Sequence, residues 1–359
     1  MSTLKVNAIS DAAGANGNAI TLATDGSCTV KATNRSSNII VNGAMNVAQR
    51  GTSSTSSLYQ TVDRFRFAWS GTDENPTQAQ VDVASGTTPY TLGFRKSLKV
   101  TNGNQTSGAG ADDRVAFEYR IEAQDIAGSG WNYVSASSNI TLSFWVKSSV
   151  AQNFYFYLET VDGTAQIYTM ETGALSADTW TKITKTIPGN SNIQVDNDNN
   201  IGLKLQFMYY TGTDYTNNSQ SLNTWGAYSS ASRSPDQTTT WYTTNDATFE
   251  MTGLQLEVGD VATDFEHRSY GEELARCQRY YQTVPDSVLS SGYGSADGYS
   301  RGSHIYVQTM RASPTVTITE TSTGSLIAQG SSKDGFYATF SGLTGSGASL
   351  FNFIAAAEL

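Results

Sequence analysis

Apolar and polar residues alternate in one short run after another through the middle of this 359-residue chain. In residues 140–146 every second side chain is apolar, and the same spacing recurs in residues 154–158 and 203–209. A period of two is the period of a half-buried β-strand. Tyr155 and Tyr157 place aromatic rings on the second face of one run, so we expect that face to be partly covered or used. The pattern predicts a mainly β protein, with an antiparallel jelly-roll sandwich as its largest part.

The apolar residues change parity near the end of this region. They occupy odd positions up to Met251 and even positions from Leu254 onward. One strand can keep both groups on the same face only if its register shifts between them. Gly253 lies at the point of change, and a glycine inside a strand commonly marks a β-bulge. We therefore predict a bulge at Gly253.

One later segment has the spacing of a helix instead. Ser269 and Glu272 form a capping box, in which each side chain accepts a hydrogen bond from the backbone N–H of the other residue. The apolar residues that follow the cap are spaced four, three and four apart, at Tyr270, Leu274, Cys277 and Tyr281. This predicts one short junction helix within residues 266–283. The stripe either packs on its own domain or meets copies of itself at a threefold axis, and its length is too short for the pattern to decide.

These elements divide the chain into four parts, residues 1–35, 36–265, 266–283 and 284–359. The second part is the jelly roll and the third is the helix. The last part is a small C-terminal β domain, whose expected strands cover residues 305–310, 315–319, 336–340 and 350–354.

The N-terminal part predicts a strand followed by a hairpin. Leu4, Val6 and Ala8 alternate with polar residues, and the dipeptide Asp25-Gly26 is a strong hairpin signal. A segment this short cannot bury a core of its own. We therefore expect it to attach to the next domain, to neighbouring chains or to a larger particle.

Acidic residues outnumber basic ones, 32 to 22, and the formal net charge is −10 at pH 7. Nucleic-acid binding needs a basic footprint, so the charge argues against it and against adhesion to anionic lipid. No stretch has the length of a membrane span, and residues 1–10 lack the apolar core of a signal peptide. Cys28 and Cys277 fall in unrelated segments, which disfavours a disulfide framework. We expect synthesis and assembly in a reducing cytoplasm, without membrane insertion.

The sequence contains no motif for catalysis or metal binding. The two histidines, His267 and His304, have no metal-ligand spacing, and neither do the two cysteines. There is no nucleophile elbow and no phosphate-binding loop. Residues 196–200 begin like an EF-hand, but the loop glycine comes one position late, at Gly202, and Phe207 takes the place of the bidentate glutamate. A polar turn is the better interpretation, and we predict a protein that is not an enzyme and needs no cofactor.

Aromatic residues in polar segments are the positive signal for a binding site. Sugar rings stack their C–H faces on Trp and Tyr, while nearby amides and hydroxyls bind the sugar hydroxyls. Candidates in segments rich in Thr, Ser and Asn are Tyr209, Tyr210, Tyr215, Trp225, Tyr228, Trp241 and Tyr242. Tyr293 and Tyr299 are further candidates, in a Gly/Ser-rich passage of the C-terminal domain. The alternative is that these rings fill the sandwich core or subunit interfaces.

Several motifs occur in a specific order along the chain. They are NRSSNIIVNGAMNVAQRG at 34–51, TVDRFR at 61–66, YRIEAQDI at 119–126 with LSFWVK at 142–147, TGLQLEVGDVATD followed by FEHRSYGEELARCQRYY at 252–281, MRASPTV at 310–316 and AEL at 357–359. Together they resemble the tail-fibre and other appendage proteins of tailed, especially marine, bacteriophages. The order is also similar to that of carbohydrate-binding jelly-roll modules, which allows a structural calcium near Asn42, Glu250 and Glu257.

The resemblance implies a virion structural protein, a homotrimeric tail fibre or spike in the tail appendage. Its N-terminus would bind other virion proteins, and its outer domains would bind a host-surface polysaccharide or lipopolysaccharide, with adsorption strengthened by multivalency. Tyr270, Leu274, Cys277 and Tyr281 would then form the trimer interface. One alternative is a purely structural virion component, such as a head fibre, collar or adaptor. Another is a tailspike that degrades polysaccharide.

Overall fold

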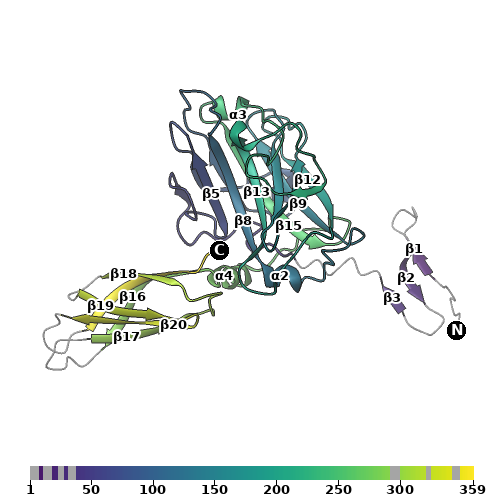
Figure 1. Cartoon of the computed structure of the whole chain (residues 1–359). Helices are drawn as coiled ribbons and strands as arrows, with labels where there is room; N and C mark the ends of the chain where they lie inside the picture. The colour runs from purple at the N-terminus through teal and green to yellow at the C-terminus, as the bar shows by residue number, and fades with distance from the viewer. Residues whose placement is uncertain are drawn as a thin grey trace.

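Two six-stranded antiparallel sheets pack face to face and make up the largest part of the molecule (Figure 1). The computed structural model describes residues 8–10, 18–22, 28–30, 38–291, 300–320, 325–341 and 348–359. The first sheet, here the β8 sheet, has the strand order β14 (Trp225–Ala227), β11 (Gln166–Glu171), β10 (Tyr155–Thr160), β13 (Ile201–Thr211), β8 (Arg114–Glu122) and β5 (Phe65–Ser70). The second, the β9 sheet, has the order β12 (Thr181–Pro188), β9 (Asn139–Ser148), β15 (Thr248–Val258), β7 (Lys96–Thr101), β6 (Thr77–Asp82) and β4 (Ser53–Ser54). Successive strands cross repeatedly from one sheet to the other, so the architecture is the jelly-roll sandwich that the sequence predicts.

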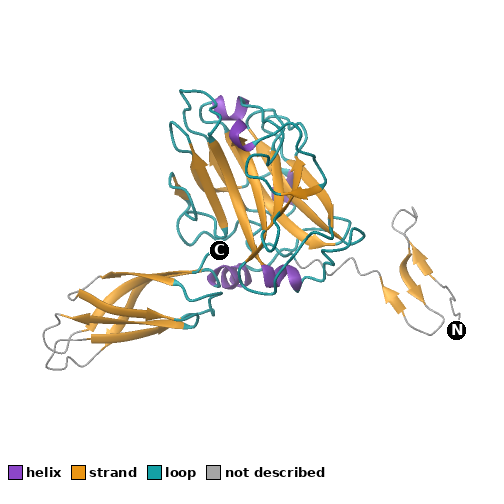
Figure 2. Cartoon of the chain, viewed as in Figure 1, coloured by secondary structure: helices purple, strands orange, loops and turns teal. Residues whose placement is uncertain are grey.

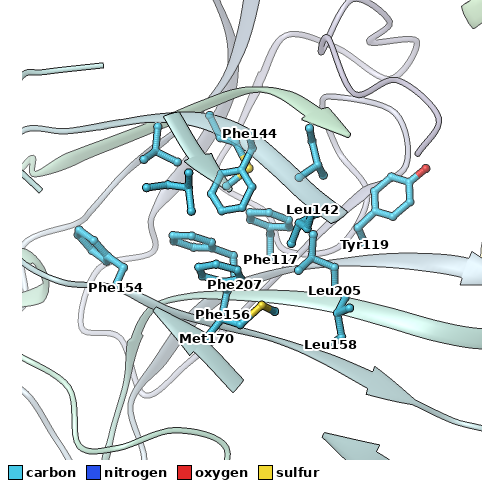
Figure 3. Packing of buried hydrophobic residues seen from close by; sticks show 14 of the residues in the cluster. Phe117, Tyr119, Leu142, Phe144, Phe154, Phe156, Leu158, Met170, Leu205 and Phe207 are labelled. Carbon is cyan, nitrogen blue, oxygen red and sulfur yellow. The ribbon is translucent and has the colours of Figure 1, made fainter. Parts of the chain in front are cut away.

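The inner faces of the two sheets carry the apolar residues of the alternating runs (Figure 3). Phe207 of β13 lies at the centre, with its ring 5.8 Å from the rings of Phe117 and Phe156 and stacked on both. Phe144, from the opposite sheet, meets Phe156 edge-on at 5.2 Å. Each such aromatic pair contributes about 0.5–1.5 kcal/mol beyond the burial of its surface. The three apolar rows predicted from the sequence are confirmed.

Strand β15 contains the predicted bulge. Its pairing with β9 shifts register between Thr252 and Gln255. Gly253 lies between them in the left-handed region, with φ +66°, and a Cβ at this position would lie 2.6 Å from Cζ of Phe94. Both the backbone and the packing of that ring therefore require glycine.

The junction helix, α4, spans Tyr270–Gln278 and begins with the predicted capping box. It ends earlier than predicted, and Tyr281 is the first residue of strand β16 (Tyr281–Ser291). The short helices α1 (Thr88–Thr91), α2 (Ala123–Ala127) and α3 (Thr240–Thr243) and the 3₁₀ turn η1 (Thr213–Tyr215) were not predicted, because about one turn is too short to show a period. Among the described helices, none is both long enough and apolar enough to cross a membrane.

The apolar stripe of α4 is not one exposed face, which corrects the prediction that Tyr270, Leu274, Cys277 and Tyr281 form a trimer interface. Cys277 is 1% exposed and Tyr281 is also buried, both within their own chain, whereas Tyr270 is 59% exposed. Leu274 is half-buried, and its neighbour Glu273 accepts a hydrogen bond from the backbone N–H of Asn42 in the sandwich. The helix thus packs on its own jelly roll, and Cys277 and Tyr281 are unavailable to another chain.

The C-terminal domain is a smaller sandwich of two three-stranded antiparallel sheets. One sheet consists of β16, β21 (Ala348–Ala356) and β18 (Thr315–Glu320), and the other of β17 (Ser300–Ile305), β20 (Gly335–Ser341) and β19 (Ser325–Ser331). Three of the four predicted strands are confirmed. The fourth, at 305–310, is wrong, because β17 ends at Ile305. The residues after it form a loop, in which the N–H groups of Tyr306 and Met310 donate to the carbonyls of Asp334 and Lys333.

The N-terminal part contains a three-stranded antiparallel sheet of β1 (Ala8–Ser10), β2 (Asn18–Leu22) and β3 (Cys28–Val30). Strands β2 and β3 pair with Leu22 opposite Cys28, as expected for the predicted hairpin. Leu4, Val6 and the Asp25-Gly26 dipeptide lie outside the described residues.

A junction beside α4 joins the jelly roll to the C-terminal domain (Figure 2). Arg64 is buried there, pairs with Glu358 at 2.6 Å and lies 3.4 Å from the centre of the Tyr280 ring. Glu122, with 0% of its surface exposed, accepts hydrogen bonds of 3.0 and 2.8 Å from Arg279. Arg311 donates to the carbonyl of Ala357 at 2.7 Å. These residues belong to five of the motifs that resemble phage appendage proteins, so the motifs meet at one place in the fold.

Candidate functional site

Four of the predicted aromatic contact residues lie in the core of the jelly roll. Tyr209, Tyr210, Trp241 and Tyr242 are all buried, and Trp241 is 0% exposed. Trp241 stacks on Tyr209 at 5.4 Å and donates its indole N–H to the carbonyl of Thr248, while Tyr210 and Tyr242 stack at 4.4 Å. These rings close one end of the core and offer no face to a ligand. The prediction that they contact a glycan is therefore wrong, because residues 208–211 belong to β13 and residues 240–243 form α3, whose two rings are buried.

The other predicted aromatic residues differ in position. Trp225 is mostly buried, donates its indole N–H to the Pro188 carbonyl at 2.7 Å and borders a cavity of about 420 Å³. Tyr215 and Tyr228 are half-buried and lie in the long connection between β13 and β15. Tyr293 and Tyr299 lie outside the described residues.

A cavity of about 370 Å³ lies on the outer side of the β9 sheet, and we call it the Trp145 pocket. Trp145 alternates along β9 with the core residues Phe144 and Val146, so it points away from the core, and it is half-buried. The rest of the lining includes Phe94, Ser143, Lys182, Gly253, Thr263, Asp264, Phe265 and His267. A volume of this size is within the range of small-molecule sites.

Packing and hydrogen bonds hold the walls of the Trp145 pocket in place. The ring of Phe94 lies 4.9 Å from that of Phe265 and 5.1 Å from that of His267. Nε2 of His267 is 2.8 Å from the carbonyl oxygen of Leu92, and because a carbonyl only accepts, this nitrogen donates. Thr263 donates from its N–H and its hydroxyl to Glu257. The bulge at Gly253 leaves room for the Phe94 ring, so the feature that breaks the strand also shapes the pocket.

The Trp145 pocket combines an indole with exposed Lys182, Asp264 and His267. Trp145 lies in a strand, so the expectation that binding aromatics lie in polar loops does not include it. The signal that identifies it is parity: Trp145 is on the face opposite the apolar row of β9, where it packs beside the small cluster of Ala44, Val83 and Phe94 and also borders the cavity.

A row of polar side chains crosses the outer face of the β8 sheet. Its members are neighbours on adjacent strands: Arg66 on β5, Glu118 on β8, Gln206 on β13, Tyr157 on β10 and Thr169 on β11. On β8, Arg114 is four places before Glu118 and Arg120 is two places after it, so both point to the same side as Glu118. We call this surface, together with Arg233, the arginine face.

Three guanidiniums of the arginine face share one carboxylate. Arg120 lies 2.8 Å, Arg66 3.2 Å and Arg114 3.5 Å from the oxygens of Glu118. Burial raises the pKa of Glu118, but the charges of Arg120 and Arg66 together with a hydrogen bond from Arg120 lower it by more. The net shift of the pKa is therefore downward. Glu118 is therefore ionised at neutral pH, and the three arginines exceed it by two positive charges.

The connection between β13 and β15 folds over part of the arginine face. Arg233 donates its backbone N–H to the carbonyl of Tyr215 and accepts at its own carbonyl from the Thr169 hydroxyl. Its guanidinium lies 4.9 Å from the centre of the Tyr215 ring. Within the part of the chain that the structure describes, Arg233 has no ion-pair partner, and its Nε and Nη1 have no hydrogen bond.

Tyr157 lies below this connection, and its hydroxyl donates to Oε1 of Gln206 at 2.7 Å. Burial raises the pKa of Tyr157, while the charges of Arg233 and Arg114 lower it. Arg233 and Arg114 are thus close enough for their charges to favour the ionised form of the Tyr157 hydroxyl. The other end of the same amide, Nε2 of Gln206, has no hydrogen-bond partner among the described residues, although Gln206 is only 2% exposed.

The residues predicted to lie near a structural calcium already have protein partners. Asn42 donates its side-chain N–H to the carbonyls of Val47 and Asp63. Glu250 pairs with Lys147 at 2.8 Å, and Glu257 accepts from Thr263. Over the described residues, no three His, Cys, Asp or Glu side chains are grouped as metal ligands.

No protein-family model matches this chain, and no curated protein matches its sequence. Similar solved structures include the enzymatically active domain of tailspike protein 4 of bacteriophage CBA120, with 10% identity and a TM-score of 0.33 over 62% of this chain and 21% of that one. A CBM4 structure has 11% identity and a TM-score of 0.32, over 61% of this chain and 98% of that one. The N-terminal cellulose-binding domain of β-1,4-glucanase C from Cellulomonas fimi has 10% identity and a TM-score of 0.28, over 60% and 99%. These values are too low to assign a ligand, which has to be inferred from the surface of the chain itself.

Proposed function

We propose that this protein is a non-catalytic glycan-binding component of a phage virion and that its jelly roll binds the glycan in the Trp145 pocket. The observation that carries the proposal is a half-buried indole lining a cavity of about 370 Å³ that also has His267, Lys182 and Asp264 in its wall. A sugar ring can stack its C–H face on the indole, while the ammonium and the carboxylate bind its hydroxyls. The pocket is held by Phe94, Phe265 and Glu257, so little ordering is needed when the sugar binds.

The setting that we propose is a tail appendage that adsorbs to a host-surface polysaccharide or lipopolysaccharide. The junction supports this setting, because five appendage-like motifs supply its buried ion pairs. A junction of this kind holds two β domains in a fixed relation, which suits a protein that projects from a particle. A purely structural virion component is the alternative if no glycan is bound.

Trimer formation is part of the proposal. Ile305, Val307 and Tyr337 of the C-terminal domain are exposed, and apolar side chains on a small domain favour contact with further chains. Light scattering after size exclusion should give three times the chain mass of 38.5 kDa. A monomer would contradict this part of the proposal and favour an adaptor that assembles only on the particle.

The proposal is tested first by screening the protein against bacterial surface polysaccharides and then by calorimetry with the best ligand. Trp145→Ala should weaken that ligand about tenfold or more, because the stacking surface is lost. Trp69→Ala is the control, since Trp69 is also half-buried but lies in the other sheet. Equal affinity of wild type and Trp145→Ala would refute the pocket. Release of reducing ends from the ligand would refute the non-catalytic assignment.

A further inference from the structure

We infer that the arginine face is a second binding site, which takes the carboxylate or sulfate groups of an acidic polysaccharide. It lies on the outer face of the β8 sheet and shares no residue with the Trp145 pocket, which lies on the β9 sheet. The inference extends the proposed function and does not depend on that pocket.

The first argument is charge. The chain as a whole carries −10, yet this face holds four arginines, three of which, Arg66, Arg114 and Arg120, share the carboxylate of Glu118. The neighbouring pair of Lys204 and Glu159, at 2.8 Å, is neutral, and Glu171 on β11 offsets one more positive charge, so the four arginines exceed Glu118 and Glu171 by two. Anions are therefore attracted to this face of a protein that otherwise repels them.

The second argument is unused hydrogen-bonding capacity. Among the described residues, Nε2 of Gln206, Nε of Arg114 and both Nε and Nη1 of Arg233 are buried without a partner. Gln206 is 2% exposed and Arg233 is 8% exposed. Leaving buried donors unpaired is unfavourable, so such groups are normally satisfied by a ligand or by water. All of these atoms are donors, and the ligand groups that match several donors are anionic oxygens.

The third argument concerns the kind of ligand. The polar row from Arg66 to Thr169 crosses five strands, and Gln206, Tyr157 and Thr169 are buried at one end of it, so its open part is the arginine cluster around Glu118 together with the edge of the connection that carries Arg233. Half-buried Tyr155, Tyr215 and Tyr228 accompany the row, and at the β14 edge the cavity beside Trp225 is lined by Thr164, Asn192 and Gln194. An isolated anion needs neither the aromatic rings nor the amides, whereas a charged sugar uses both.

The test uses the full chain with two probes, polygalacturonate for carboxylates and heparin for sulfates. Binding is measured by calorimetry, with fully methyl-esterified polygalacturonate as the uncharged form of the first probe. We expect wild type to bind at least one of the two acidic probes, to lose that binding with rising salt and not to bind the ester. The probe that binds identifies the anionic group.

Two variants locate the site. The double variant Arg114→Gln/Arg233→Gln should reduce affinity about tenfold or more, because two charged donors are lost. Gln206→Glu is nearly isosteric, keeps an acceptor for the Tyr157 hydroxyl and places a carboxylate in the site, so it should reduce affinity similarly even if the double variant folds poorly. Arg276→Gln is the matched control, since Arg276 is exposed on α4 and away from the face, and it should bind as wild type does.

Several results would overturn the inference. They are failure of wild type to bind either acidic probe, equal binding of the methyl ester, or wild-type affinity in folded Gln206→Glu. Tighter binding of duplex DNA than of either polysaccharide would also overturn it, by making the face a nucleic-acid surface. None of these outcomes bears on Trp145→Ala, so the second site and the Trp145 pocket can fail separately.

Discussion

Arginines are used in two different ways in neighbouring parts of this molecule. At the junction, Arg50, Arg64 and Arg279 are matched by three carboxylates, those of Asp63, Glu358 and Glu122. On the arginine face, three arginines share Glu118, and Arg233 has no carboxylate partner within the described chain. Arg120 borders both regions, because it also donates to the carbonyl of Leu359.

The difference between the two regions is one of charge balance. A buried group of ion pairs is stable only if each charge is compensated, and removal of one partner is then strongly unfavourable. A partly exposed group with excess charge adds little to stability, since water screens it, but it keeps the capacity to bind an anion. The junction therefore stabilises the arrangement of the two domains, and the arginine face remains available for a ligand.

The largest effect is expected at the junction. Arg64→Leu removes the cation that pairs with Glu358 at 2.6 Å and stacks on Tyr280, and it should lower the free energy of unfolding by about 3 kcal/mol or more. Urea unfolding followed by fluorescence measures the change. Arg276→Leu, an exposed change on α4, is the control and should stay within about 0.5 kcal/mol of wild type.

A second variant separates charge balance from packing at the same place. Arg64→Leu/Glu358→Leu removes both members of the 2.6 Å pair and should recover part of the stability that Arg64→Leu loses, because Glu358 is then not left buried with Arg50 as its one ion-pair partner. If the double variant is as unstable as the sum of the two single variants, the ion pair is not what stabilises the junction.

A smaller effect is expected from the polar row of the arginine face. Gln206→Leu leaves the buried Tyr157 hydroxyl without its acceptor and should cost about 1–3 kcal/mol. Gln206→Leu/Tyr157→Phe removes both members of the hydrogen bond and should be close to wild type. Thermal unfolding of the two variants measures the difference. A double variant that is less stable than Gln206→Leu would mean that the row contributes to stability in the same way as the junction.

A still smaller effect is expected from Arg66→Gln. Glu118 keeps Arg120 at 2.8 Å and Arg114 at 3.5 Å, so the loss of the third guanidinium should change stability by less than about 1 kcal/mol. Urea unfolding at low and high salt measures it. A loss comparable to that of Arg64→Leu would remove the distinction between the two clusters.

The sequence predicts those parts of the fold that a local pattern of residues determines. Alternation in residues 140–146 and 203–209 fixes which side of a strand is apolar. The parity change near Gly253 requires a register shift, and glycine is the residue that adopts the positive φ of the bulge there. The capping box of α4 was also predicted, because its two residues are three apart in sequence. The end of the helix was not, since Tyr281 is drawn into β16 by its pairing with Ala356, a residue that local spacing does not reveal.

The candidate sites were harder to predict, because exposure is a tertiary property. Trp241 and Tyr209 lie in polar segments, as a binding residue would, but Trp241 of α3 stacks on Tyr209 of β13 and both rings are buried in the core. Trp145 and Gln206 lie in strands and carry no local mark of function. Their role depends on which strands become neighbours: β9 meets the segment before α4, and β13 lies between the arginines of β8 and the tyrosines of β10.

The smallest effect is expected in the pH dependence of the free energy of unfolding, when one carboxylate from each region is compared. For Asp63 at the junction, burial raises the pKa above its ordinary value, and hydrogen bonds from Gln49 and the charge of Arg50 only partly offset this. Its contribution to stability is therefore present below the pKa of the unfolded chain, near 3.8, and is lost as the pH rises through the raised value. For Glu118 the net shift is downward, so its contribution is present above about 4.5 and is lost as the pH falls through the lowered value.

The two carboxylates thus predict opposite slopes in acid. The free energy of unfolding of wild type minus that of Glu118→Gln should decrease as the pH falls below about 4.5, and wild type minus Asp63→Asn should increase as the pH falls toward 3.8. Each change should be on the order of 1 kcal/mol or less. Urea unfolding at half-unit intervals between pH 7 and about 3.5 resolves them. If both differences have the same sign of slope, the charge of Arg50 lowers the pKa of Asp63 as the arginines lower that of Glu118. The two clusters would then differ in ligand binding alone.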